Sequence, residues 1–237
     1  MEGWGGLRIA GLDEAGRGCV IGPMAVAGIL VDEEGFVELQ RLGVRDSKAL
    51  SPARREELAG EIMTVALAHI VVLIPPRQLD LAVARNALNK LEAKVMAGII
   101  DVLRPDVAYV DAGDVVEARF ASMIRSCCSL GPSLSIVAEH EADARYPVVA
   151  AASILAKVER DRAVQAIKEE LGADFGSGYP SDPRTIRFLE EWCSRHSSLP
   201  DCVRKSWRTV RELMVRKRTA RLDLWAEGGK MGGGSGR

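Results

Sequence analysis

The chain has 237 residues, of which 47% are hydrophobic and 27% charged, and its formal net charge is −1. This length and composition are typical of a soluble globular protein with a real core, built as one domain with an appendage or as two small domains. No apolar run approaches the ~18 residues that span a membrane, and the first residues lack the basic and apolar regions of a secretory signal. We therefore expect a cytoplasmic protein with no membrane partner.

The cysteines, the histidines and the distribution of charge limit the kinds of site and partner that the chain can have. The five cysteines are odd in number and include no C-x-x-C spacing, and the three histidines are scattered, which favours reduced thiols over disulfides or a zinc site. Charge is unevenly spread, because residues 204–221 carry a net +7 whereas residues 1–203 carry −8. An acidic body with a basic C-terminal segment indicates an anionic partner held by that segment.

The apolar pattern predicts strands first and then an alternation of strands and helices. Strands are predicted at residues 9–13, 20–31, 69–74, 107–111 and 134–138. Helices are predicted at residues 51–68, 79–103 in one or two pieces, 146–171 and 183–193, in a segment that ends at 125, and in the basic segment after 204. The first two strands are expected to form a hairpin, and a charged loop follows residue 31. Together these elements predict an α/β fold, a mixed sheet flanked by helices.

This order of elements brings two acids to one edge of the sheet. The later units are long enough for right-handed crossovers, which would make the strand at 107–111 parallel to the first strand. If the two strands are neighbours, Asp13 and Asp111 lie together at their C-terminal ends. Ligands usually bind at that edge of an open α/β sheet.

The stretch from Leu7 to Gly18 holds the first candidate site. A buried strand is predicted to end in two adjacent carboxylates, Asp13 and Glu14, and Gly-Arg-Gly comes at residues 16–18. Two adjacent carboxylates need a positive partner, and Mg²⁺ or Mn²⁺ prefers such oxygen ligands. Gly16 and Gly18 let the backbone approach a ligand closely, and Arg17 adds a cation. The alternative is a solvated Asp-Glu turn at the end of a strand.

Asp111 and Asp143 complete a set of four candidate carboxylates with Asp13 and Glu14. Four acids around one sheet edge would repel one another, and two divalent cations ~3.5–4 Å apart would neutralise them and suit phosphodiester cleavage. Taken alone, Asp143 could instead cap the N-terminus of the following helix, and Asp111 could be an ordinary acid at a strand end. Lys48 and Lys157 are candidate phosphate contacts, although each could equally be a solvated lysine.

Other common site motifs are absent from the sequence. Ile21 occupies the position of the third glycine of a dinucleotide fingerprint, and no Walker A loop, G-x-S-x-G elbow or H-E-x-x-H helix is present. Ser153 lies in an apolar helical run without a nearby histidine, so we expect it to pack rather than to act as a nucleophile.

Several segments occur in one order along most of the chain, from about residue 7 to residue 215. They are Gly11-Leu-Asp-Glu-Ala-Gly-Arg-Gly18 with Ile21-Gly-Pro23, Asp46-Ser-Lys48, Tyr109-Val-Asp111, Ala142-Asp143 leading into Tyr146-Pro-Val-Val-Ala-Ala-Ala-Ser-Ile-Leu-Ala-Lys157, and Gly176-Ser-Gly-Tyr-Pro180. This set closely resembles the ribonuclease HII family, the type 2 ribonucleases H, and its archaeal branch most of all. The resemblance implies a ribonuclease H-like mixed sheet flanked by helices, with a helical C-terminal extension.

The resemblance also implies an activity and its substrates. The expected enzyme is an endonuclease that cuts the RNA strand of RNA–DNA hybrids. It is also expected to cut duplex DNA on the 5′ side of a single embedded ribonucleotide, leaving 3′-hydroxyl and 5′-phosphate ends. The implied cofactors are two divalent ions, Mg²⁺ or Mn²⁺, and the implied oligomeric state is a monomer.

Site roles carry over by position in the matching motifs. The implied metal-binding catalytic acids are Asp13, Glu14, Asp111 and Asp143, and the implied substrate-binding residues are Gly16, Arg17, Gly18, Lys48 and Tyr179. The glycine-rich segment would sense the 2′-hydroxyl that distinguishes RNA from DNA. The ring of Tyr179 would stack on the deoxyribose that follows the ribonucleotide, and Lys48 would contact a phosphate.

One departure and three regions complete the comparison with the family. Archaeal relatives often have Lys where this chain has Glu141, and the added negative charge should raise the pKa of Asp143 and alter metal affinity. The expected regions are a ribonuclease H-like catalytic domain at residues 1–172, a helical C-terminal extension at 173–221 and a flexible tail at 222–237.

Two further functions remain as alternatives to a metal-dependent endonuclease. A non-catalytic nucleic-acid-binding module on the same scaffold would need the basic segment but not four acids. A small-molecule phosphohydrolase would leave the basic segment unexplained, and salt-insensitive binding would favour it over both nucleic-acid functions.

Overall fold

The computed structural model describes residues 6–44 and 51–228 and contains a mixed sheet of five strands in the order β3-β2-β1-β4-β5. The strands are β1 (Ile9–Ala15), β2 (Met24–Val31), β3 (Ala68–Ile74), β4 (Val107–Asp111) and β5 (Ser135–Glu139). The central strand β1 pairs antiparallel with β2 and parallel with β4, as predicted, and Leu12 is in register with Val110. The α/β fold class is therefore confirmed, with β1 as a strand that has neighbours on both sides.

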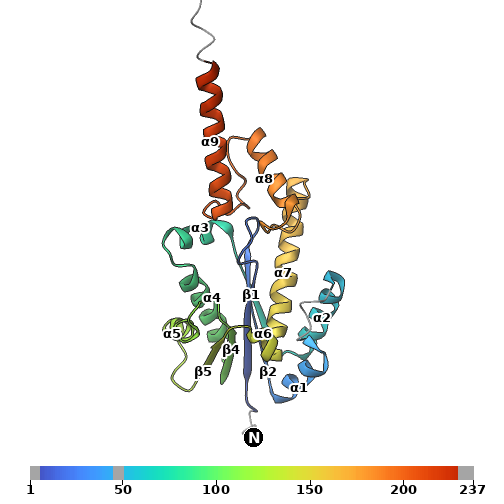
Figure 1. Ribbon diagram of the computed structural model, residues 1–237. Helices are drawn as coiled ribbons and strands as arrows, with labels where there is room; N and C mark the ends of the chain where they lie inside the picture. Colours follow the sequence, from blue (N-terminus) through green and yellow to red (C-terminus); the bar gives the residue numbers. More distant parts are fainter. Residues whose placement is uncertain (1–5, 45–50, 229–237) are drawn as a thin grey trace, which may run out of the picture.

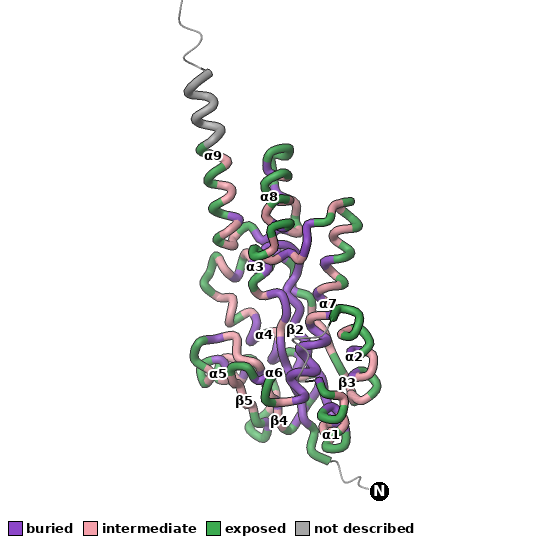
Figure 2. Tube along the Cα trace, turned by 45° about the vertical axis from the view of Figure 1, so that its right-hand side comes forward, coloured by how far each residue is buried: buried purple, intermediate pink, exposed green. Residues whose placement is uncertain are grey.

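Helices cover both faces of the sheet (Figure 1). One face packs against α1 (Glu33–Arg41), α2 (Pro52–Val65) and the long α7 (Pro147–Leu171). The other face packs against α3 (Pro76–Ala84), α4 (Leu88–Leu103) and α5 (Glu117–Cys127). The short α6 (Ala142–Arg145) precedes α7, whereas α8 (Pro183–Arg195) and α9 (Arg208–Gly228) project beyond the end of the sheet. Figure 2 shows that the buried chain runs through the central strands between these layers.

The strand β1 and the helix α7 are in close contact at Gly11. A Cβ atom on Gly11 would lie 2.6 Å from the backbone nitrogen of Val149 and closer still to the carbonyl group of Val148. The first half of α7 makes this approach possible because its residues are small and apolar, and all of them from Pro147 to Ala156 are buried. The contact places Ser153, one turn further along α7, beside the acidic end of β1.

The structure corrects two sequence-based expectations near the N-terminus. The predicted charged loop after residue 31 contains helix α1, whose first N–H groups are capped when Gly35 N donates to Asp32 Oδ1 at 2.8 Å. Glu33 and Glu34 lie in the first turn, where negative charge favours a helix. The charges therefore belonged to a helix start and not to a loop.

The second correction concerns residues 20–23, which were predicted to begin the second strand. Val20 N and Ile21 N donate to Gly178 O at 2.8 and 3.2 Å, and Gly22 N donates to Cys202 O at 2.8 Å. These hydrogen bonds to distant parts of the chain hold the segment away from the sheet, so β2 begins only at Met24.

The helical pattern at 79–103, predicted as one or two pieces, forms two helices, α3 and α4. They are separated at Asn86, which has a left-handed conformation with φ of 51°. Helix α9 continues to Gly228, beyond the start of the predicted tail at residue 222. The division into three regions stays a prediction. In the part of the chain that the structure describes, no helix is both long and apolar enough to cross a membrane.

Candidate active site

Strand β1 ends at Ala15, two residues beyond the predicted end at Asp13, so Asp13 and Glu14 both lie inside it. Asp13 is buried, with 4% of its surface exposed, and lies opposite Ala27 of β2 in the antiparallel pair. The solvated Asp-Glu turn is therefore wrong. On the other side, Asp111 ends the parallel neighbour β4, one residue after the paired Leu12–Val110 position. The predicted meeting of Asp13 and Asp111 at one end of adjacent parallel strands follows from this register.

Asp143 approaches the same region through α6. It is buried on this short helix, and Ala142 N donates to Asp111 Oδ1 at 3.1 Å, which attaches α6 to the end of β4. Helix α7 begins after Tyr146 and has no side-chain cap, so Asp143 does not cap it. The neighbouring Glu141 is exposed and has a left-handed backbone with φ of 54°.

The two acids on β1 have strongly perturbed pKa values. Burial raises the pKa of Asp13 well above its usual range, and the nearby charges of Glu14 and Asp111 raise it further, while a hydrogen bond from Ser153 opposes the shift. Burial, followed by repulsion from Glu92, raises the pKa of Glu14 to about 8. The charge of Arg17 opposes the shift at Glu14 but does not cancel it, so Glu14 is largely protonated at pH 7 when no cation is bound.

This acidic cluster fits a divalent cation chemically. Glu14 Oε2 is buried without a hydrogen-bond partner, and a cation would supply the charge that the cluster lacks. Asp13, Glu14, Asp111 and Asp143 are the residues that could hold it. Within residues 6–44 and 51–228, no group of three or more Asp, Glu, His or Cys side chains is already arranged around one ion position.

Glu14 opens into a cavity of about 390 Å³ that also contains the predicted substrate-binding residues. Its lining residues are Glu14, Ala15, Gly16, Arg17, Gly18, Arg55, Lys157, Arg160, Asp161 and Tyr179. The Gly-Arg-Gly segment and Tyr179 meet here, and a Cβ on Gly18 would lie 3.8 Å from the Tyr179 ring. Gly16 has a φ of 82°, a backbone angle that residues with a side chain rarely adopt. We refer to this space as the Gly-Arg-Gly pocket. Lys48 lies outside the described residues.

Cations line this pocket beside two carboxylates, Glu14 and Asp161, and Asp161 forms ion pairs with Arg55 and Arg160. Lys157, noted in the sequence, is joined by Arg55 and Arg160, which sequence reasoning missed. The guanidinium of Arg160 stacks 4.7 Å from the centre of the Tyr179 ring and donates to Ser177 O at 3.3 Å. Positive side chains of this kind bind phosphate oxygens through charge-assisted hydrogen bonds.

The C-terminal region holds the Gly-Arg-Gly segment in place from behind. Arg204 is fully buried and donates to Gly22 O at 2.9 Å and to Arg17 O at 3.0 Å. Its guanidinium also lies 4.9 Å from the ring centre of Trp207. Burial lowers the pKa of Arg204 to about 10. The basic segment 204–221 therefore includes one cation, Arg204, that supports the Gly-Arg-Gly loop and does not face a partner.

The side chain of Arg17 has partners that the sequence analysis did not identify. It forms an ion pair with Glu92 of α4 and donates to Asn89 Oδ1 at 2.6 Å. Glu92 is completely buried, on the same face of α4 as Met96 and Ile99. The sequence did contain a signal for this ion pair, because Glu92 lies in line with apolar residues of the same helix face. A buried acid at such a position needs a charged partner from elsewhere in the fold.

Known proteins share both the sequence and the fold. The ribonuclease HII family model matches residues 10–210. Ribonuclease HII of Pyrococcus abyssi is 46% identical over 220 residues, which cover 92% of this chain and 96% of that protein. The crystal structure of ribonuclease H2 from Pyrococcus horikoshii OT3 matches with a TM-score of 0.83 at 41% identity, covering 90% of this chain and 99% of that chain. Bst-RNase HIII in complex with Mn²⁺ shares the fold, with a TM-score of 0.75 at 19% identity over 91% of this chain and 71% of that chain.

The central strands carry buried acids beside a cation-lined pocket, and ribonucleases H match the sheet that contains them. These features define a hydrolase with a ribonuclease H-like fold. The overlap with the P. abyssi protein extends over nearly the whole length of both chains. The chain belongs to the ribonuclease HII family, and it is accordingly a ribonuclease H, an endoribonuclease.

Proposed function

We propose that this ribonuclease H hydrolyses the RNA strand of RNA–DNA hybrids and cuts duplex DNA on the 5′ side of single embedded ribonucleotides. The products would carry 3′-hydroxyl and 5′-phosphate ends. The observation that carries the proposal is the meeting of Glu14, the Gly-Arg-Gly segment and Tyr179 in one cation-lined pocket beside the buried Asp13. This pocket combines groups for a metal, for phosphates and for a sugar edge.

In this proposal Asp13, Glu14, Asp111 and Asp143 hold two divalent ions, Mg²⁺ or Mn²⁺. When bound, such ions generate hydroxide from water and stabilise the leaving oxygen and the charge on the phosphate. The chain contributes a rigid site. Ser153 donates to Asp13, and the hydrogen bond from Ala142 N orients Asp111. The close packing of β1 on α7 at Gly11 also restrains the strand that carries Asp13 and Glu14.

The selection of ribose is proposed to come from the Gly-Arg-Gly pocket. Backbone groups at Gly16 and Gly18 can reach a sugar edge because no side chain intervenes, and the 2′-hydroxyl is the group that marks RNA. Tyr179 would offer its ring to the next sugar, which lacks that oxygen. Arg160, packed against the ring, limits the orientations that Tyr179 can adopt. The phosphate role of Lys48 stays a prediction.

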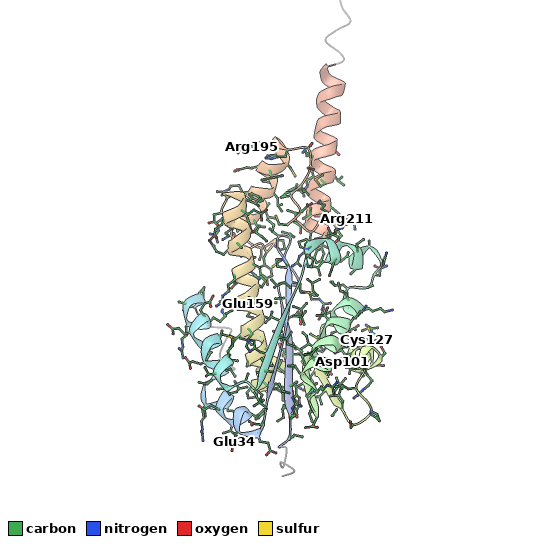
Figure 3. The ribbon with its side chains drawn as sticks, turned by 180° about the vertical axis from the view of Figure 1, so that it is seen from behind. Glu34, Asp101, Cys127, Glu159, Arg195 and Arg211 are labelled. Atoms are coloured by element: carbon green, nitrogen blue, oxygen red, sulfur yellow. The ribbon has the colours of Figure 1, made fainter. Side chains whose placement is uncertain are left out.

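The basic C-terminal extension is proposed to contact the duplex through phosphates, and the enzyme is proposed to act as a monomer. Figure 3 shows Arg211 near the start of α9 and Arg195 at the end of α8, on the part of the molecule that projects beyond the sheet. For phosphate contacts of this kind, the logarithm of the binding constant falls linearly with the logarithm of the salt concentration. Binding of the duplex should therefore fall steeply with salt.

The direct test uses a labelled DNA duplex that carries one ribonucleotide. Wild-type protein and Asp111→Asn are incubated with it in Mg²⁺, Mn²⁺ or EDTA, and the products are separated by length. The expected result is a single metal-dependent cut on the 5′ side of the ribonucleotide that is lost in Asp111→Asn. Salt-dependent binding without a cut in either metal would refute this function and favour a non-catalytic binding module.

A further inference from the structure

The ion pair beneath the Gly-Arg-Gly pocket connects the substrate-facing loop to the interior of the protein. Arg17 lines the pocket and its side chain is 28% exposed, whereas its partner Glu92 is 0% exposed. The two terminal nitrogens of the guanidinium have different partners, since Nη1 pairs with Glu92 and Nη2 donates to Asn89. Asn89 and Glu92 lie three residues apart on α4 and therefore share one helix face. Arg17 is thus held in one orientation from below.

A second row of contacts fixes the partner residues themselves. Asn89 accepts from Arg17 through its Oδ1 atom and donates from Nδ2 to Asp114 Oδ2 at 2.8 Å, so both ends of its amide are engaged. Asp114 in turn is bound by Arg119, whose Nε donates to it at 3.0 Å. Asp114 belongs to the loop that follows Asp111 at the end of β4. The network therefore joins α4, α5 and the loop after a catalytic strand.

Gly113, in the same loop, packs directly on the ion pair. A Cβ at this position would lie 2.9 Å from Glu92 Cδ, and closer still to Glu92 Oε1 and Arg17 Nη1. The loop after β4 therefore closes over the pair without leaving room for even a methyl group. Any side chain at 113 would displace the guanidinium or the carboxylate.

Such an arrangement does more than stabilise the fold. Buried ion pairs contribute little net stability, because desolvation offsets much of their attraction, and an apolar pair would fill the same space. Holding a long side chain in its bound orientation before the ligand arrives removes part of the entropy that binding would otherwise lose. The guanidinium also retains N–H donors that neither Glu92 nor Asn89 uses, and these can serve a phosphate or sugar oxygen in the pocket.

We propose that Glu92, supported by Asn89 and by the close packing of Gly113, is a positioning residue that presents the guanidinium of Arg17 to the nucleic-acid strand. This inference rests on the proposed function, because it takes Arg17 to contact the substrate. It assigns Glu92 no contact with the substrate and no place among the metal-binding acids. Glu92 also raises the pKa of Glu14 by repulsion, so Gly113→Ala, which leaves both charges in place, separates the positioning of Arg17 from that electrostatic effect.

The test uses three single variants with a matched control. Glu92→Gln keeps the shape and removes the charge, and Gly113→Ala removes no functional group but displaces the pair. Gly98→Ala is the control, because Gly98 is exposed on the same helix as Glu92 and a Cβ there meets nothing within 4 Å. Arg17→Ala and the double variant Arg17→Ala/Glu92→Gln complete a cycle. KM and kcat are measured on the single-ribonucleotide duplex, with the Mg²⁺ concentration for half-maximal rate and the melting temperature alongside.

We expect Glu92→Gln and Gly113→Ala each to raise KM about tenfold, as a weakened charged hydrogen bond does. kcat should change much less in both variants, the Mg²⁺ dependence should stay unchanged in Gly113→Ala, and Gly98→Ala should behave as the wild type. In the Arg17→Ala background, Glu92→Gln should cause no further rise in KM, because the residue it positions is gone. A KM split of this kind would not arise from general loss of structure, which lowers the active fraction and so reduces the apparent kcat.

Two results would overturn the inference. Equal losses from Glu92→Gln with and without Arg17 would mean that Glu92 acts on the metal or the reaction itself. An unchanged KM in both Glu92→Gln and Gly113→Ala would mean that the pair does not orient Arg17. If the wild type makes no cut, the proposed function fails separately. Fluorescence anisotropy of the same labelled duplex then tests positioning, where about tenfold weaker binding of both variants relative to Gly98→Ala supports it and equal binding refutes it.

Discussion

The contact between β1 and α7 at Gly11 can be tested by adding a single methyl group. The Cβ of Gly11→Ala would lie 2.6 Å from Val149 N, and closer to the Val148 carbonyl group, with backbone rather than a flexible side chain as the obstacle. Non-bonded atoms normally pack at about 3.5–4.0 Å, so strand and helix must separate by about 1 Å. No side-chain rotation can relieve this overlap.

The magnitude follows from that displacement. Overpacking a core lowers the free energy of unfolding by about 1–3 kcal/mol. Because the obstacle is backbone, we expect Gly11→Ala to lose about 3 kcal/mol, the upper end of this range. For a protein of this size, each kcal/mol lowers the melting temperature by about 2–4 °C, so we expect a fall of about 6–12 °C. Asp13 on β1 and Ser153 on α7 would move apart, and a shift of about 1 Å can reduce kcat by roughly 100-fold.

The assay combines thermal unfolding with cleavage of the single-ribonucleotide duplex. Gly60→Ala is the matched control, because Gly60 lies within α2 and a Cβ there meets nothing within 4 Å. That control should be neutral or stabilising by about 0.5–1 kcal/mol, as a glycine-to-alanine change in a helix usually is. A melting temperature of Gly11→Ala within 2 °C of wild type would mean a loss of unfolding free energy of about 1 kcal/mol or less. In that case β1 and α7 are not in tight backbone contact.

Two pH-dependent predictions follow from the charged groups. The pKa of Glu14 is about 8 in the metal-free protein, so Glu14 is largely protonated at pH 7 and must lose its proton to hold a cation. Mg²⁺ binding should therefore release protons at pH 7 and weaken as pH falls; calorimetry in two buffers of different ionisation enthalpy measures this, and identical heats would contradict it. Asp114 has a pKa held below its usual range by hydrogen bonds, with those from Arg119 foremost. A lowered folded-state pKa stabilises the protein above the unfolded-state pKa, near about 4, and this stabilisation is lost as pH falls further. Urea unfolding should show Asp114→Asn less stable than wild type at pH 7, with a smaller gap at pH 3, and a gap of the same size at both would refute this reasoning.

Local chemistry in the sequence was sufficient to predict many elements. Ser51 and Pro52 indicated a helix start, and Arg54 N does donate to the Ser51 side chain at 3.2 Å. The strand at 107–111 has the predicted bounds. These signals depend on hydrogen bonds and apolar periodicity within a few residues, which is why they can be read without the fold. Family motifs predict the four site carboxylates in the same way, as short segments in a fixed order.

Non-local hydrogen bonds account for the main error in the sheet. The segment from 20 to 23 begins with apolar Val20 and Ile21, which were joined to the strand that follows although Gly22-Pro23 is a turn signal. Its amide groups bond to Gly178 and Cys202 instead of continuing the ladder. Helix α1 was missed for a different reason, since its charged first turn was taken as a loop although Asp32 caps it.

The sequence by itself determined the α/β class, and it was sufficient to predict the four acids and the Gly-Arg-Gly segment as site residues, because each depends on residue type and on spacing along the chain. Only the tertiary structure decided what surrounds them. It placed Asp13 inside a central strand, where burial and neighbouring charge raise its pKa. It also paired Arg17 with Glu92 and bound Arg17 O to Arg204, across 75 and 187 residues. Partners so far apart leave no periodic trace in the sequence, because their meeting depends on how strands and helices pack and not on the residues that lie between them.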